Sequence, residues 1–314
     1  MMTNEAASSI TEPFLVYENH KFGYVDPNRR SISTDKYAMA RPFSEGIAAV
    51  LLETVRGYFW GYIDIVGNIA IEAKYTSAGD FREGLAVVEF NGRPGVIDLR
   101  GTFLDIQEFD EIRNFSEGLA AVRMGKKWGY ISKDGILVVS PRFDRALSFA
   151  KGLAHVDLGG KWSYIDKTGK LVLSPRFSGA FAFHEGLAPV QIEGKWGFIG
   201  KDGTVVIPAK FDSASGSSFC ESLAAVALRD RWGYIDQRGD PVVSFKFDFA
   251  APFSEGLAAV HSDGLAGYID HSGKYVIEPK FGVATEFSRG IAVVSEGKIW
   301  FCIKRDGKVI WRSG

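Results

Sequence analysis

One phrase recurs through almost the whole chain and constrains its fold more than any other feature. It begins as Phe115-Ser-Glu-Gly-Leu-Ala-Ala-Val122 and continues, after a short gap, as Lys127-Trp-Gly-Tyr-Ile131. Its first Phe recurs mostly every 34 residues, with one step of 38 and one of 36, at Phe43, Phe81, Phe115, Phe149, Phe183, Phe219, Phe253 and Phe287. A fixed period of this length is typical of tandem repeat proteins. The pattern predicts a single array of nine repeats over residues 11–314, with a degenerate first repeat at 11–42 and a disordered tail at 1–10.

Each repeat is predicted to contain three β-strands, which lie at 118–122, 128–131 and 136–139 in the repeat just quoted. Apolar residues alternate within these segments, and no segment shows the 3.6-residue period of a helix. The turn between the second and third strands often reads Asp-x-x-Gly, as at Asp166–Gly169, which is typical of a tight turn. Short turns between consecutive strands predict antiparallel meanders, and therefore an all-β fold.

The two faces of each predicted sheet differ in the size of their side chains. Trp128 and Tyr130 share one face, whereas Ala120 and Val122 share the other, and neither face is polar. We therefore expect the repeats to stack face to face, with the rings of one against the small residues of the next. The expected architecture is an open β-solenoid or superhelix, because propeller blades usually have four strands in about 40–50 residues. A closed array resembling a β-propeller is the alternative.

Charged residues recur at two further positions of the repeat. A Glu two residues after the first Phe is repeated at Glu45, Glu83, Glu117, Glu185, Glu221 and Glu255. A Lys or Arg precedes the closing aromatic residue of most repeats, as at Arg142 and Lys210. These two sets could face each other as acidic and basic ladders along a solvated edge, where each ion pair contributes about 0–1 kcal/mol.

Composition narrows the possible partners and compartment. The chain has 314 residues, is 46% hydrophobic and carries a net charge of −1, which argues against a nucleic-acid-binding surface. Cys220 and Cys302 lie in different repeats and predict free, buried thiols in a reducing compartment. The first residues do not resemble a signal peptide, and no apolar run is long enough for a transmembrane helix. We expect a cytoplasmic protein without membrane insertion.

No motif for catalysis, phosphate binding or metal binding stands out. The chain lacks a Gly-rich phosphate loop and a Gly-x-Ser-x-Gly elbow, and its five histidines lie in different repeats without metal-ligand spacing. We therefore predict no enzymatic activity, no cofactor and no metal, although a site assembled from separated residues would leave no motif. The recurring Trp and Tyr rings could form a stacking platform for a ligand, but their apolar neighbours favour a role in the core.

Two interruptions of the period are the best candidates for function. Extra residues fall at 51–59 and at 212–218, and insertions in repeat proteins often lie on the binding face. The candidate partner-binding residues are Arg56, Tyr58, Phe59, Asp212, Ser213 and Ser215. Tyr and Arg are enriched in binding hot spots. Insertions without any role are the alternative interpretation.

The recurring phrases, together with Lys195-Trp-Gly-Phe-Ile199 and Pro175-Arg-Phe177, resemble the WG-repeat family of bacterial proteins, also called KWG repeats. The resemblance covers roughly residues 14–312, and it departs from the family pattern at Pro94, Ala266 and Ser163. It implies a bacterial β-repeat protein with no shared activity, cofactor or catalytic residues.

We expect a non-enzymatic scaffold that binds a protein partner across its repeat surface. A toxin-neutralising protein is one specific version of this hypothesis. A glycan- or cell-envelope-binding module with exposed rings is the alternative, and an enzyme with a site that no motif marks is the third possibility.

Overall fold

The structure of the chain is a computed structural model that describes residues 12–18, 20–25, 31–174, 176–214 and 219–313. The expected disordered tail at 1–10 lies outside the described residues, as does Ser215. The chain divides into two compact units, residues 1–104 with 313–314 (unit 1) and residues 105–312 (unit 2). The described residues form only strands, turns and bends, so the all-β prediction is confirmed. The single array predicted for 11–314 stays a prediction.

Unit 1 contains three antiparallel sheets, with strand orders β1-β2-β3, β4-β5-β6-β7 and β10-β9-β8. Their bounds are β1 (Phe14–Glu18), β2 (Lys21–Val25), β3 (Ser31–Tyr37), β4 (Met39–Ala40), β5 (Ile47–Thr54), β6 (Gly57–Asp64), β7 (Ile69–Tyr75), β8 (Ser77–Ala78), β9 (Leu85–Phe90) and β10 (Arg93–Asp98).

Unit 2 contains six antiparallel sheets, all with their strands in sequence order. The first three consist of β11 (Glu111–Ile112), β12 (Leu119–Met124), β13 (Lys127–Ser132) and β14 (Leu137–Phe143); β15 (Arg145–Ala146), β16 (Ala154–Leu158) and β17 (Lys161–Ile165); and β18 (Gly179–Ala180), β19 (Leu187–Ile192), β20 (Lys195–Gly200) and β21 (Val205–Phe211). The last three consist of β22 (Ser213–Ala214), β23 (Ala224–Leu228), β24 (Arg231–Ile235) and β25 (Pro241–Phe247); β26 (Phe249–Ala250), β27 (Ala258–Ser262), β28 (Leu265–Ile269) and β29 (Tyr275–Phe281); and β30 (Val283–Ala284), β31 (Ile291–Glu296), β32 (Ile299–Lys304) and β33 (Val309–Arg312).

Most sheets have a fourth strand that the sequence analysis did not predict. After the closing aromatic Phe143, the chain passes through Asp144 and forms the two-residue strand β15, which pairs with β16 of the next sheet. Most repeats therefore contribute three strands to their own sheet and a short edge strand to the following one. A prediction of three strands per sheet was wrong because a two-residue strand is too short to show an alternating pattern.

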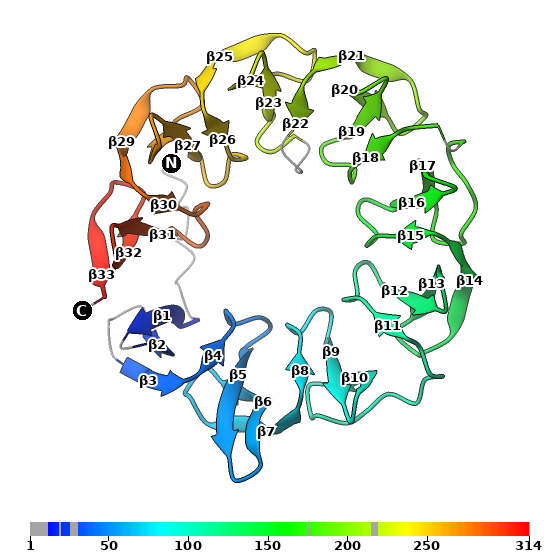
Figure 1. Cartoon of the computed structure of the whole chain (residues 1–314), viewed down its shortest axis with the longest axis vertical. Coiled ribbons are helices and arrows are strands. Elements are labelled where there is room, and N and C mark those ends of the chain that lie inside the picture. The colour runs from blue at the N-terminus through cyan, green and yellow to red at the C-terminus, as the bar shows by residue number, and fades with distance from the viewer. Residues whose placement is uncertain (1–11, 19, 26–30, 175, 215–218, 314) are drawn as a thin grey trace, which may run out of the picture. The chain divides into compact units, whose positions relative to one another are not determined.

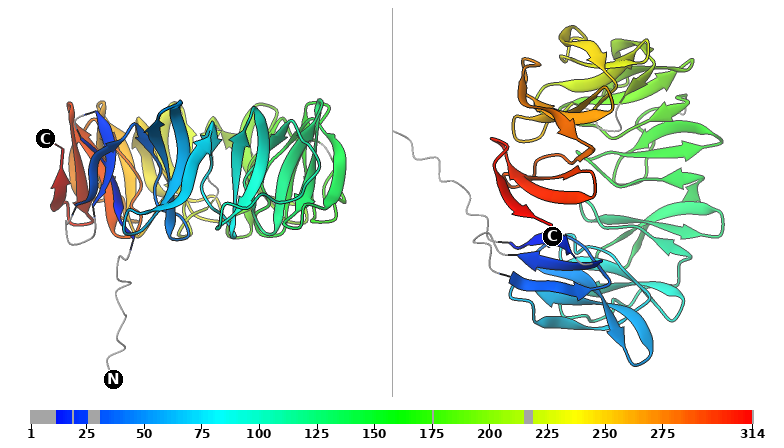
Figure 2. Two further views of the ribbon diagram at one scale, coloured as in Figure 1. Left: turned by 90° about the horizontal axis from the view of Figure 1, so that it is seen from below. Right: turned by 60° about the vertical axis from the view of Figure 1, so that its left-hand side comes forward.

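The sheets are blades of the β-propeller type, which was the alternative architecture. In unit 2 they follow one another around an arc, with the short strands on the inner side and the long closing strands on the outer side (Figure 1). Figure 2 shows the same sheets from two further directions, with antiparallel strands in each. The sheet of β11–β14 has a two-residue inner strand and a seven-residue outer strand, so it is wedge-shaped, and stacking such sheets produces a curve. The expected open solenoid was therefore wrong.

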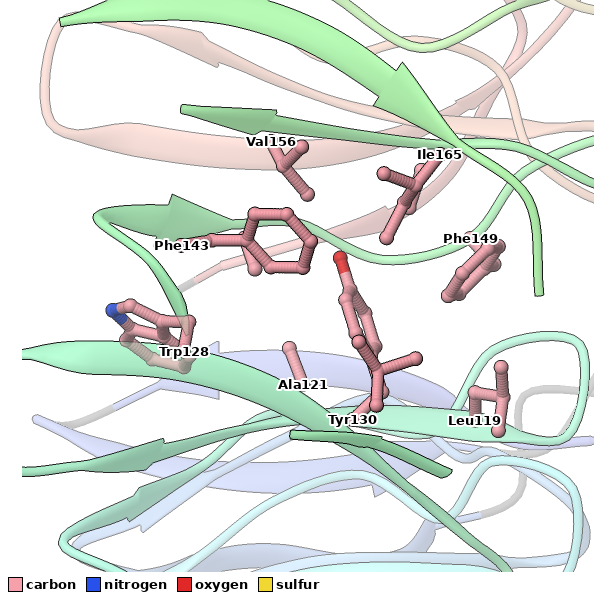
Figure 3. Packing of buried hydrophobic residues seen from close by; sticks show 11 residues of the cluster. Leu119, Ala121, Trp128, Tyr130, Phe143, Phe149, Val156 and Ile165 are labelled. Atoms are coloured by element: carbon pink, nitrogen blue, oxygen red, sulfur yellow. The ribbon is translucent and has the colours of Figure 1, made fainter. Parts of the chain in front are cut away.

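The packing between sheets agrees with the predicted contact of rings against small residues. Trp128 and Tyr130 of one sheet belong to the same buried cluster as Val156 and Ile165 of the next sheet. Figure 3 shows these four side chains facing one another across the interface. Tyr130 is fully buried, and burying an aromatic ring of this size stabilises the fold by about 1.5–3 kcal/mol. The recurring rings therefore form the core between blades.

The Gly that follows Trp in most repeats is explained by a bulge in the closing strand. Between the pairs Trp128↔Phe143 and Tyr130↔Val139, the closing strand contains two extra residues. A Cβ on Gly129 would lie 2.2 Å from the carbonyl oxygen of Val139, which is too close for any side chain. The Gly is thus required by the close approach of the neighbouring backbone.

Candidate functional site

The insertion at 51–59 forms the longest hairpin in unit 1. Strands β5 and β6 pair in regular register from Ile47↔Asp64 to Thr54↔Gly57, so the extra residues lengthen the ladder (Figure 1). The Thr54 hydroxyl closes the turn by donating to the carbonyl oxygen of Gly57 at 2.8 Å and accepting from the amide of Arg56 at 3.2 Å. Gly57 has a φ of +112°, a conformation that favours Gly. This insertion is an ordered structural element.

The tip of this hairpin presents apolar and basic side chains to solvent. Val55 and Tyr58 have exposed fractions of 104% and 56%, and Arg56 is also exposed. Phe59 is half-buried and pairs across the ladder with Leu52, which packs against the core between the first two sheets of unit 1. Arg56 and Tyr58 are therefore available to a partner, whereas Phe59 also supports the hairpin.

The second candidate region has a structural explanation for one of its residues. The carboxylate of Asp212 accepts from the Lys195 ammonium and, at 2.6 Å, from the amide of Arg229. Asp144 makes the same kind of contacts two sheets earlier in the same unit, with the Lys127 ammonium at 2.6 Å and the amide of Gly159 at 2.8 Å. Ser213 is half-buried and pairs with Ala227 in the sheet. These contacts hold the start of each short strand, and a partner-binding role for Asp212, Ser213 and Ser215 stays a prediction.

The recurring Glu residues do not pair with the recurring Lys and Arg residues as suggested from the sequence. Instead, most of the Glu carboxylates accept from a backbone amide in the next repeat, as Glu117 does from Gly152 at 2.9 Å. Burial alone would raise the pKa of Glu117, but the hydrogen bonds from Gly152 and Lys167 hold it below its ordinary value. Arg176 donates separately to the carbonyl oxygen of Gly203 at 2.8 Å, also in the next repeat. Both sets therefore join consecutive sheets within a unit.

The recurring Tyr hydroxyls make a third set of contacts between sheets. Tyr130 donates to the carbonyl oxygen of Leu147, 17 residues later in the chain, at 2.7 Å. Burial raises the pKa of Tyr130 above its usual value, so the hydroxyl stays protonated as a donor. The same contact is made by Tyr24, Tyr62, Tyr164, Tyr234 and Tyr268. Phe198 occupies the Tyr position in the sheet of β18–β21 and has no hydroxyl to donate.

The sheet of β15–β17 departs most from the repeat. Ser163 replaces the Gly that follows Trp, and its hydroxyl donates to the carbonyl oxygen of Leu173. A long closing strand is absent from this sheet among the described residues, and only isolated bridges remain at Phe177 and Leu171. A Cβ at the equivalent Gly129 would lie 2.2 Å from the carbonyl oxygen of Val139, so the Cβ of Ser163 is incompatible with the bulged closing strand of that sheet.

A histidine and an aspartate are buried in this same sheet, in addition to Ser163. Both ring nitrogens of His155 lack a hydrogen-bond partner within the described part of the chain, and the imidazole packs near Trp162 and Tyr164. Burial, aided by the positive charge of Arg113, lowers the pKa of His155 to about 4. Asp157 is also buried and pairs with Arg145 at 2.6 Å. Several other repeats carry Ala at the position of His155, as at Ala121 and Ala225.

The Trp rings are mostly covered, as the core interpretation expected. Trp128 and Trp162 are buried, whereas Trp60, Trp196, Trp232 and Trp300 are half-buried. The exposed row of rings that a glycan-binding surface would need is therefore not formed by these residues.

Other kinds of site were sought in the same residues. In the ranges that the structure describes, no group of three metal-ligating side chains comes together. None of the described residues belongs to a helix with the length and apolarity needed to cross a bilayer. Cys302 is buried, which raises the pKa of its thiol to about 11, whereas Cys220 is half-buried; both thiols are free.

One informative position was overlooked in the sequence. Lys151 takes the place of the recurring Glu in Phe149-Ala-Lys-Gly152, and this substitution is visible in the repeat pattern. The effect of replacing Glu by Lys151 depends on which groups the recurring Glu carboxylates contact, and the sequence does not show these contacts.

Comparisons with curated proteins and solved structures give only distant similarities. No curated protein matches the chain. Among solved structures, Hsv2p of Kluyveromyces lactis is 11% identical, with 76% of this chain and 98% of that chain covered and a TM-score of 0.47. The dihydro-heme d1 dehydrogenase NirN is 12% identical, with 96% of this chain and 73% of that chain covered and a TM-score of 0.47. Similarities this distant carry no conclusion about function.

The family comparison covers most of the sequence. The family described as WG containing repeat matches residues 22–53, 60–93, 95–128, 128–162, 162–196, 196–231, 232–265 and 267–300. The match at 128–162 begins in β13 of one sheet and ends after β16 of the next, and the other matches follow the same period. The chain therefore belongs to the family of WG-containing repeat proteins.

Proposed function

We propose that this chain is a non-enzymatic repeat scaffold that binds another protein through the hairpin of β5 and β6. The observation that carries the proposal is the extended ladder that holds Val55, Arg56 and Tyr58 away from the sheet. Most other exposed residues of the hairpins lie on shorter ladders. An ordered tip loses less conformational entropy on binding than a mobile loop does, which favours affinity.

The chemistry of the tip supports a protein partner. Tyr58 supplies a large ring with a polar hydroxyl, and Arg56 supplies a planar cation, which are the side chains enriched at the centres of protein interfaces. Fully exposed Val55 adds apolar surface that water solvates poorly. The absence of a polar cluster at the tip gives it no evident catalytic chemistry.

The experiment compares partner capture by three versions of the chain in extract from its own source. In the test variant, residues 53–58 are replaced by the Gly-Lys turn that follows Met124, which removes four residues and keeps Leu52 opposite Phe59. The matched control is Val66→Ala, which changes an apolar side chain that is 70% exposed in a turn of the same sheet. We expect the shortened hairpin to lose partners that the wild type and the control retain.

A second variant separates side-chain chemistry from hairpin length. Arg56→Ala combined with Tyr58→Ala leaves the ladder and the half-buried Phe59 in place. This variant should lose the same partners as the shortened hairpin while keeping the wild-type melting temperature. Equal capture by all the variants would show that the hairpin is not the contact surface. A toxin-neutralising role is a finer version of the proposal, and identifying the captured protein would test it.

A further inference from the structure

In unit 2, recurring Glu carboxylates make the same contacts with the next repeat. These contacts define the position that a carboxylate occupies between the two repeats. Oε2 of Glu117 lies 2.9 Å from the amide nitrogen of Gly152 and 3.4 Å from the ammonium nitrogen of Lys167. The Lys167 ammonium also donates to the backbone carbonyl oxygen of Glu117 at 2.9 Å. One carboxylate therefore meets a Gly amide and a side chain of the next turn between the second and third strands.

The same arrangement recurs later in the unit. Both oxygens of Glu221 lie 3.0 Å from the amide nitrogen of Gly256, and Nε2 of His271 lies 2.8 Å from Glu221. Glu255 accepts from the amide of Gly290 at 2.7 Å. Lys167 and His271 occupy equivalent positions in their turns, and both contact the carboxylate of a recurring Glu. The position of the carboxylate is therefore the same with either side chain in the turn.

At Lys151 the donors are present but the carboxylate is replaced by a cation. Lys201 donates to the backbone carbonyl oxygen of Lys151 at 2.9 Å, the distance that Lys167 keeps from the carbonyl of Glu117. The ammonium of Lys151 and the amide of Gly186 have no acceptor within the ranges that the structure describes. Gly186 is exposed, whereas the equivalent Gly152 is half-buried.

The acidic neighbour of this loop is already engaged elsewhere. Glu185 precedes Gly186, but its carboxylate is directed to the next repeat. There it accepts from the amide of Ser222 at 3.0 Å and from Gln237 at 3.2 Å. The Lys201 ammonium and the Gly186 amide thus correspond to the two donors that meet the carboxylate of Glu117, and no carboxylate of the chain stands between them, because Lys151 replaces the Glu.

We propose that Lys151, Lys201 and the amide of Gly186 bind a carboxylate supplied from outside the chain. The geometry of Glu117 shows how an oxygen would sit, accepting from the amide and facing the ammonium of the next turn. Charge-assisted hydrogen bonds of this kind are stronger than neutral ones, and two cations favour an anion. Because all three residues are exposed, salt screens the interaction and a single carboxylate binds weakly. This inference goes beyond the proposed function, since it concerns a different surface from the hairpin of unit 1.

The experiment follows the backbone amide of Gly186 by NMR in the full chain labelled with ¹⁵N-glycine. Sodium acetate is the probe, and sodium chloride at equal ionic strength is the reference. We expect the Gly186 resonance to move saturably with acetate and not with chloride. The amides of Gly152 and Gly256, which already meet Glu carboxylates, should remain in place and serve as internal controls.

Two variants make the test decisive. Lys151→Glu should move the Gly186 amide without acetate and abolish its response, because the loop then resembles the one at Glu117. Glu117→Lys should make the Gly152 amide respond to acetate. The proposal is overturned if Gly186 responds no more than Gly152 in the wild type, if chloride reproduces the shift, or if Lys151→Glu leaves Gly186 unchanged.

A further titration identifies the source of the carboxylate. A short peptide with blocked ends and a single Glu is compared with acetate in the same assay. Tighter binding of the peptide assigns the site to an acidic side chain of a protein, and equal binding assigns it to small free carboxylates.

Discussion

His155 should make the folded chain sensitive to mildly acidic pH. Its imidazole is 5% exposed and packs against Trp162 and Tyr164, so the protonated form is disfavoured in the folded state. Burial lowers its pKa from 6.5 to about 4, with a further contribution from Arg113. The unfolded chain therefore binds a proton more readily than the folded chain between these two values.

The sign and size of the effect follow from this difference. The free energy of unfolding is highest above pH 6.5, which is the ordinary pKa of a histidine. It falls as the pH drops towards 4, because the unfolded state takes up the proton first. The loss is about 1.4 kcal/mol per pH unit within this range. It amounts to about 2 kcal/mol at about pH 5 and to about 3 kcal/mol when the range has been crossed.

The assay compares urea unfolding of the wild type and His155→Ala at about pH 7 and pH 5. Ala occupies the equivalent position in other repeats, as at Ala121 and Ala225, so the variant is compatible with the sheet. We expect the variant to lose about 2 kcal/mol less than the wild type over this interval. His184→Ala, which changes an exposed histidine, is the matched control and should behave like the wild type. Parallel pH dependence of the wild type and His155→Ala would refute the argument.

Three further predictions concern the contacts that define the repeat. Gly129→Ala places a Cβ 2.2 Å from the carbonyl oxygen of Val139, so the closing strand must shift. We expect the free energy of unfolding in urea to fall by about 3 kcal/mol and the amides of that strand to exchange faster. An unchanged exchange pattern would contradict the bulge geometry. Tyr130→Phe removes the donor to the next sheet and should cost about 1 kcal/mol by the same unfolding assay, whereas a neutral result would mean that water replaces the hydroxyl. Glu117→Gln weakens the contact with Gly152 and should destabilise the chain at neutral pH by about 1 kcal/mol. Because the pKa of Glu117 is lowered in the fold, this difference should disappear as the pH falls through the Glu range, and a difference that persists in acid would exclude the charge as its cause.

The candidate sites were only partly accessible to sequence analysis. The insertion at 51–59 was located from the period alone, because four extra residues displace every later repeat. Asp212 looked like part of an insertion, but it repeats the contact made by Asp144 with a lysine of the same sheet. The significance of Lys151 required the position of Gly186, which lies in the next repeat. Contacts between repeats cannot be read from a pattern within one repeat.

The amino-acid sequence by itself determined the repeat, the all-β class, the strands of each meander and the two faces that pack together. These features follow from local alternation, turn residues and the size of side chains such as Tyr130 and Ala120. Only the tertiary structure decided that the sheets are propeller-type blades with a fourth strand. The two-residue strand β15 has no periodicity to detect, and it forms because the chain bends after Phe143 and pairs with the next repeat. The wedge shape that curves the stack depends on this pairing, which is a property of two repeats together.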